Sequence, residues 1–77
     1  MATWHGWGQN LDVRKIRVWI AEMSSHIESI TIDYERSGVT VRIVGDSYTF
    51  HCDNRIALVR MYRYAIRCMA FAERNRP

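Results

Sequence analysis

Residues 31–52 read TIDYERSGVTVRIVGDSYTFHC and alternate between apolar and polar side chains over three short runs. Such alternation is typical of strands that turn one face to a core and the other to water. Two dipeptides, Ser37-Gly38 and Gly45-Asp46, separate the runs, and two-residue turns of this kind join antiparallel neighbours. The stretch therefore predicts three strands in consecutive hairpins, which is an antiparallel meander.

The alternation also predicts which residues pair. A turn at 37–38 sets Ile32 opposite Ile43, and a turn at 45–46 sets Ile43 opposite Tyr48. Every inward residue then meets another inward residue, as a sheet with a single buried face requires. The opposite face is polar throughout, so we expect helices to cover the inner face only. The residues expected to point inward are Ile32, Tyr34, Val39, Val41, Ile43, Tyr48, Phe50 and Cys52.

A helical period precedes the meander. Apolar residues recur at spacings of three and four from Val13 to Ile30, which predicts an amphipathic helix over about residues 11–28. Asn10 or Asp12 can cap its first turn. Before this helix, residues 1–10 are rich in Trp and Gly and predict an irregular arm. Its Trp4, His5 and Trp7 either fold back over the core or present aromatic surface to a partner.

A second helical period follows the meander and runs to about residue 74. Asp53 or Asn54 can cap it. Its apolar positions gather on one face at about 100° per residue: Leu58, Met61, Tyr62, Ala65, Cys68, Met69 and Ala72. The chain of 77 residues is short for more than one domain. The prediction is one α+β domain over residues 11–77, ordered α-β-β-β-α, with two helices packed on one face of a three-stranded meander.

The positive charge is concentrated at the end of the chain. Residues 54–77 carry six Arg and one Glu, whereas residues 1–53 carry five basic and seven acidic side chains. Ten of the eleven basic residues are Arg, whose planar, multi-donor guanidinium suits carboxylates and phosphates. The basic second helix is therefore the first candidate for a binding surface.

Within that helix, the arginines form a stripe opposite the apolar face. Like charges then meet on adjacent turns, and each such pair opposes helix formation by a few tenths of a kcal/mol. The stripe is either a solvated outer face or a surface that contacts anions on a protein or a nucleic acid. The wide apolar flanks also allow a homodimer through this helix. The predicted partner-binding residues are Arg60, Arg63, Arg67 and Arg74, with Tyr64 and Phe71 as aromatic support.

Other classes of function have little support in the sequence. The three histidines lie on separate elements without metal-ligand spacing, and no phosphate-binding Gly loop or nucleophile elbow is present. We therefore expect no catalytic residue, no metal and no cofactor. Cys52 and Cys68 are too far apart on the expected elements for a disulfide, so both are expected to be reduced. No apolar run approaches the ~20 residues that span a bilayer, and a cytoplasmic protein is expected.

The element order resembles two groups of proteins. The double-stranded-RNA-binding domain shares the helix, three-strand meander and helix. Its Gly-Pro-x-His-type loop and its lysine cluster are replaced here by Ser37-Gly38 and by Asp53-Asn54-Arg55-Ile56. In size and order the chain also resembles the small phage-encoded inhibitors of bacterial defence, including anti-CRISPR proteins, which share no common motif. This second resemblance implies a viral protein that works in the host cytoplasm.

Together these observations lead to one main hypothesis and one alternative. The main hypothesis is a non-enzymatic protein that docks on a larger target and blocks it, with an acidic protein surface or a protein–nucleic-acid complex as the partner. The alternative is a nucleic-acid-binding domain that contacts phosphates with the same Arg stripe.

Overall fold

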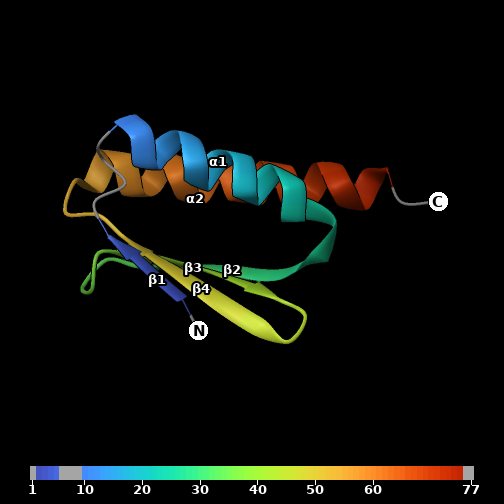
Figure 1. Ribbon diagram of the computed structural model, residues 1–77, viewed down its shortest axis with the longest axis horizontal. Coiled ribbons are helices and arrows are strands. Elements are labelled where there is room, and N and C mark those ends of the chain that lie inside the picture. The colour runs from blue at the N-terminus through green and yellow to red at the C-terminus, as the bar shows by residue number, and fades with distance from the viewer. Residues whose placement is uncertain (1, 6–9, 76–77) are drawn as a thin grey trace.

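Two helices lie on one face of a single β-sheet (Figure 1). The computed structural model describes residues 2–5 and 10–75. The described elements are β1 (Ala2–His5), α1 (Asn10–Met23), a 3-10 turn η1 (Ser24–His26), β2 (Ile27–Asp33), β3 (Gly38–Ile43), β4 (Asp46–His51) and α2 (Arg55–Arg74). The α+β class, the α-β-β-β-α order and the antiparallel pairing of the three central strands are confirmed.

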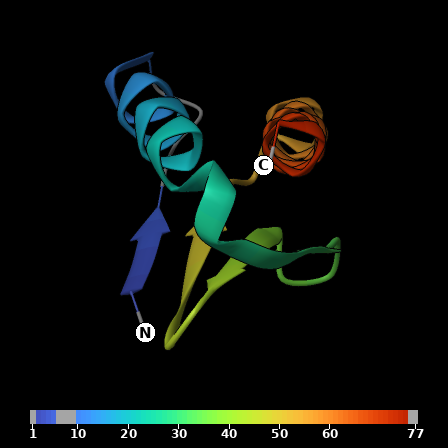
Figure 2. The ribbon, with the colours of Figure 1, turned by 90° about the vertical axis from the view of Figure 1, so that its right-hand side faces the viewer.

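The layers are simple when the molecule is viewed from its end. Figure 2 shows α1 above the β1 and β4 side of the sheet and α2 above the β3 and β2 side. The two helices contact each other and run in the same direction (Figure 1). Helices therefore cover only the inner face of the sheet, as we predicted from the polar side chains on its outer face.

The first hairpin pairs in a different register from the predicted one. Ile32 lies opposite Val39, not Ile43, because the connection spans residues 34–37 instead of two residues. The Asp33 carboxylate accepts hydrogen bonds from the backbone N–H groups of Glu35 (3.0 Å) and Arg36 (3.2 Å) and thereby forms a wider turn. The register moves by an even number of residues, so the same side chains still face the core.

Tyr34 is the residue most affected by this wider turn. It was expected to point inward, but it lies in the turn and is 49% exposed. The Arg55 guanidinium at the start of α2 lies 5.2 Å from the centre of its ring. The prediction for Tyr34 was wrong because the turn begins before it and not after it.

The second hairpin is also shifted, by two residues. Ile43 pairs with Asp46 and Val41 pairs with Tyr48, so the turn is at 44–45 and not at 45–46. Gly45 takes a φ of +85°, a region that costs a side-chain-bearing residue about 1–2 kcal/mol. The turn is therefore placed where the chain can reverse without strain.

The first helix ends earlier than predicted. It stops at Met23, and the Ser24 hydroxyl donates a 2.9 Å hydrogen bond to the Ala21 carbonyl oxygen. Ile27 and Ile30, which continued the helical spacing in the sequence, belong instead to β2 and are buried there. A β-branched run such as IESITID fits a pleated strand better than a helix.

The N-terminal segment supplies a fourth strand. The expectation of an irregular arm was wrong for Ala2–His5, which form β1 and pair in parallel with β4. Residues 6–9, including Trp7, lie outside the described residues. The side chains of Trp4 and His5 lie outside the description as well.

One apolar core joins the sheet and both helices. Trp19 of α1 packs against β4, with ring centres 4.6 Å from Tyr48 and 5.7 Å from Phe50. Cys52 is buried and Cys68 is half-buried, and both thiols are free, as expected. The buried residues are Ile16, Ile20, Ile27, Ile30, Val39, Val41, Ile43, Phe50, Cys52, Leu58, Met61 and Ala65.

Helix α2 begins with a side-chain cap, and we expect its loss to be measurable. Asn54 Oδ1 accepts hydrogen bonds from the N–H groups of Ile56 (3.0 Å) and Ala57 (3.2 Å). Replacing Asn54 with alanine should lower the free energy of unfolding by about 1 kcal/mol, because two N–H groups lose their acceptor. Urea denaturation followed by circular dichroism measures this loss. Asn54→Asp keeps an acceptor and should lose much less; equal losses in the two variants would contradict the capping role.

Candidate functional site

The arginine stripe lies on the outer side of α2. The helix turns Leu58, Met61 and Ala65 into the core, and at 3.6 residues per turn the opposite side faces solvent. Four arginines project from that side, and all of them are exposed: Arg60, Arg63, Arg67 and Arg74. The structure thus brings the four predicted Arg residues together on one accessible surface, which we call the Arg face.

The ion pairs found among the described residues do not involve the Arg face. Among the described residues, ion pairs join Arg36 to Asp33 (3.9 Å) and Arg42 to Glu28 (3.7 Å), and neither pair includes a residue of α2. No described carboxylate forms an ion pair with the Arg face. Its guanidinium groups are therefore hydrated, and an external anion can reach them without displacing an internal partner.

Tyr64 lies at the boundary between the Arg face and α1. Its hydroxyl donates a long, 3.4 Å hydrogen bond to the Arg17 carbonyl oxygen. The Arg17 guanidinium in turn lies 5.3 Å from the centre of the Tyr64 ring, within cation–π range. Tyr64 therefore holds the two helices together, and Arg17 becomes an additional cation beside the Arg face.

The hydroxyl of Tyr64 stays protonated at neutral pH. Burial raises its pKa above the usual value of 10.0, and the neighbouring Cys68 thiol raises the pKa further. The nearby Arg17 and Arg67 favour the phenolate and act in the opposite direction. The net shift is upward, so Tyr64 remains a hydrogen-bond donor to α1 over the whole physiological range.

A groove opens between the C-terminal halves of the two helices. It has a volume of about 640 Å³, and both apolar side chains and arginines line it. Phe71, the second aromatic residue of the predicted site, stands in its wall and is 64% exposed. The residues that line the groove are Ala21, Ser24, Tyr64, Arg67, Cys68, Ala70, Phe71 and Arg74.

Apolar side chains also reach the surface on the other flank of α2. Ile66 on this flank is half-buried. Ile56, seven positions before Arg63 and therefore in line with the Arg face, is 67% exposed. A shallow hollow of about 430 Å³ lies between Tyr62, Arg63, Ile66 and Arg67. The Arg face is thus bordered by apolar surface on both sides, a composition common in protein interfaces.

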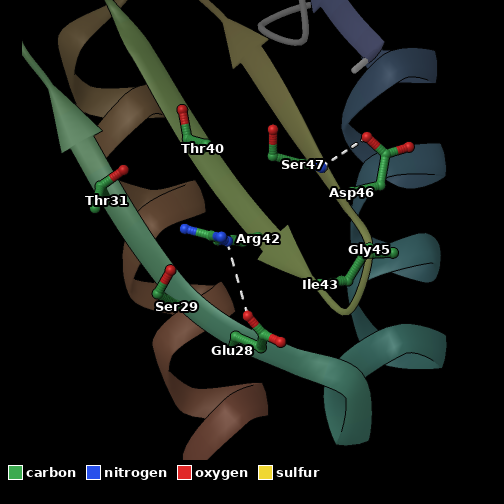
Figure 3. A pocket seen from close by; sticks show the side chains of 9 residues that line it. All are labelled: Glu28, Ser29, Thr31, Thr40, Arg42, Ile43, Gly45, Asp46 and Ser47. Atoms are coloured by element: carbon green, nitrogen blue, oxygen red, sulfur yellow. Dashed lines mark hydrogen bonds and ion pairs between the residues drawn. The ribbon is translucent and has the colours of Figure 1, made fainter.

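The outer face of the sheet carries a second hollow, of about 610 Å³ (Figure 3). Hydroxyl side chains dominate it, and Thr31, Thr40 and Thr49 occupy neighbouring positions on three adjacent strands. Thr40 and Thr49 share a 3.0 Å hydrogen bond between their hydroxyls. Arg42 projects into the hollow but is paired with Glu28, so this surface has no unbalanced cation of the kind found on α2.

An acidic group also borders this hollow. The pKa of Asp46 is lowered, chiefly because its carboxylate accepts a 2.8 Å hydrogen bond from the Ser47 N–H. Asp46 is therefore negatively charged at neutral pH.

Two further properties of the described residues bear on the kind of site. No three His, Cys, Asp or Glu side chains among them lie close enough together to hold a metal ion. Neither helix, over its described length, is long and apolar enough to cross a membrane.

Comparison with known proteins gives no relative. No family model, no curated protein and no solved structure matches the chain. The functional argument therefore depends on the geometry and charge of the surfaces described above.

Proposed function

We propose that this chain is a non-enzymatic binding protein that docks through the Arg face of α2 on a larger macromolecular target and blocks it. One observation carries the proposal. Four exposed arginines share one side of α2, and no described carboxylate pairs with any of them. A solvated surface needs no such concentration, because interspersed charges of both signs solubilise a protein without the like-charge repulsion.

An acidic partner would relieve the strain that this arrangement places on the helix. Arg60, Arg63 and Arg67 follow at spacings of three and four, so each like-charge pair opposes the helix by about 0.2–0.5 kcal/mol. A carboxylate on the partner accepts two parallel hydrogen bonds from a guanidinium, and such charge-assisted pairs are stronger than neutral ones. Binding therefore gains the new contacts and also removes the repulsion.

The proposed partner is an acidic protein surface, alone or within a protein–nucleic-acid complex. The resemblance in size and element order to phage-encoded anti-CRISPR proteins supports a bacterial defence complex in the host cytoplasm as the target class. A homodimer through α2 has less support, because a symmetric pairing would set one Arg face against another.

A nucleic-acid partner is the second candidate. The exposed ring of Phe71 beside Arg67 and Arg74 favours it, because a base can stack on such a ring while the guanidiniums contact phosphates. This mode predicts an affinity that falls steeply with salt and shows little base preference.

One pair of variants separates these candidates from an inert surface. In Arg60/Arg63/Arg67→Ala the Arg face loses three charges, whereas Lys15/Arg36/Arg42→Ala loses the same number from other surfaces. Host proteins retained by the wild type and by the control, but lost with the Arg-face variant, would support the protein target. Fluorescence anisotropy with double-stranded DNA, double-stranded RNA and single-stranded RNA at two salt concentrations tests the second candidate. Indistinguishable behaviour of the two variants in both assays would rule out the Arg face as the binding surface.

A further inference from the structure

The sequence of α2 repeats itself every seven residues along the Arg face. Residues 60–66 read RMYRYAI and residues 67–73 read RCMAFAE, and Arg74 begins a third repeat. In each of the first two repeats an aromatic residue follows the arginine by four positions, so the two side chains lie on the same side of the helix. Positions seven apart fall on nearly the same side of a helix, so the two pairs of an Arg and an aromatic residue follow one another along it.

The first repeat is already occupied by α1. Tyr64 lies under the Arg17 guanidinium, and its hydroxyl donates to the Arg17 carbonyl oxygen. This contact closes the seam between the two helices at the level of residue 64. Tyr64, the aromatic residue of the first repeat, therefore takes part in the packing between α1 and α2.

The second repeat has no such cover. Figure 1 shows that α1 ends before α2 does, so the last turns of α2 project beyond it. The nearest positions on α1 and the following turn carry the small side chains of Ala21 and Ser24, which leave the groove open. Phe71 therefore occupies the position equivalent to Tyr64 and stays 64% exposed.

Because Phe71 lies exposed in this open groove, we infer that the groove receives an acidic amphipathic helix of the partner. This inference rests on the proposed function. An apolar side chain of that helix packs against Phe71 over Cys68 and Ala70. Its carboxylates face Arg67 and Arg74, which are about 10 Å apart along the axis at 1.5 Å per residue. Acidic residues seven positions apart on the incoming helix have the same spacing.

The groove favours a helix over a nucleic acid. Cys68, Ala70 and Phe71 line it beside the two arginines. A duplex that contacts the arginines with its phosphates keeps its bases stacked and leaves this apolar surface in water, and a single strand could cover only the ring of Phe71 with one base. An amphipathic helix satisfies both requirements, because its apolar stripe is flanked by charged positions that set partner choice.

The test uses a labelled 21-residue peptide with leucine at every seventh position and glutamates on both sides of the leucine stripe. Its controls are a peptide of the same composition in scrambled order, polyglutamate and double-stranded DNA. We expect the amphipathic peptide to bind at least tenfold more tightly than the scrambled one. Phe71→Ala should weaken binding at least tenfold, and Ser24→Trp, which fills the groove, should do the same. Ile56→Ala removes an equally exposed apolar side chain outside the groove and should change affinity less than twofold.

The outcomes distinguish this inference from the proposed function. Equal binding of the ordered and scrambled peptides, lost in Arg67/Arg74→Ala but not in Phe71→Ala, would overturn the groove and leave the Arg face intact. Preferential, salt-sensitive binding of DNA, unaffected by Phe71→Ala, would replace the helix with a nucleic acid. Absence of binding to every acidic probe would overturn both proposals. Circular dichroism of each variant confirms that the fold is unchanged.

Discussion

Replacing Phe50 with alanine is expected to remove about 3–5 kcal/mol of stability. The side chain is 1% exposed at the centre of the core and packs edge-on against Trp19, with ring centres 5.7 Å apart. A domain of 77 residues has a total stability of roughly 4–12 kcal/mol. The variant should therefore lose a large fraction of its stability, and at the lower end of this range it should be close to its unfolding midpoint at 25 °C. Urea denaturation followed by circular dichroism measures the change directly.

The same substitution at Phe71 is its matched control. Phe71 is 64% exposed in the groove wall, so Phe71→Ala removes the same atoms without creating a cavity and should change stability by less than about 0.5 kcal/mol. Similar losses at the two positions would mean that Phe71 is covered in solution or that Phe50 is not. Either result would contradict the assignment of one ring to the core and the other to the binding surface.

Helix α2 is the element that the sequence predicted best. Its apolar face, a cap at Asp53 or Asn54 and an end near residue 74 were predicted from residues within a few positions of one another, and the structure has the cap at Asn54 and the end at Arg74. The exposure of the four arginines follows from the same local periodicity. These features can be predicted without knowing what packs against the helix. The predictions therefore agree with the structure.

The strand pairing shows what local sequence patterns do not determine. The sequence predicted the inward faces of β3 and β4 but not the register, because a shift of two or four residues leaves the faces unchanged. The register was set by turns that the dipeptide pattern did not identify. Asp33 stabilises a wider first turn through its carboxylate, and the second turn lies at 44–45, one position earlier than predicted, with Gly45 at a positive φ.

The boundary between α1 and β2 was ambiguous for a different reason. Ile27 and Ile30 fit a helical spacing with Ile20, whereas residues three apart point to opposite faces of a regular strand. Both are buried in β2 because the register shifts between Ile27 and Ser29, an irregularity that the alternation pattern does not predict. Strand β1 had no local signal at all. Its parallel pairing with β4 is a long-range contact, and such a contact cannot be predicted from the sequence of four residues.

The candidate site divides in the same way. The Arg face was predicted, whereas the contact of Arg17 with Tyr64 and the open groove beside Phe71 were not. Both depend on where α1 lies relative to α2 and on the end of α1 at Met23. These features follow from tertiary packing and have no counterpart in the sequence of either helix alone.

The Arg60/Arg63/Arg67→Ala variant is expected to become more stable while it loses its partner. The change removes two like-charge pairs on adjacent turns and introduces the best helix-forming residue, which together contribute about 0.5–1 kcal/mol. The midpoint of thermal unfolding should rise by about 2–8 °C in a domain of this size. Affinity for the partner should fall on the order of 100-fold, about 2.7 kcal/mol, because charge-assisted contacts are lost.

The opposite signs make this result diagnostic. If the arginines served the fold, through the packing of their aliphatic stems, the variant would lose stability and binding together. The control Lys15/Arg36/Arg42→Ala removes the same charge but breaks the pairs with Asp33 and Glu28, so its stability should not rise and its affinity should not fall.

Salt provides a second check. At 1 M the Debye length is about 3 Å, so the repulsion within the wild-type Arg face is screened and the stability gain of the variant should shrink. The part of the gain that comes from helix propensity should remain, so a gain of undiminished size at 1 M salt would mean that the Arg face holds no electrostatic strain for a partner to relieve.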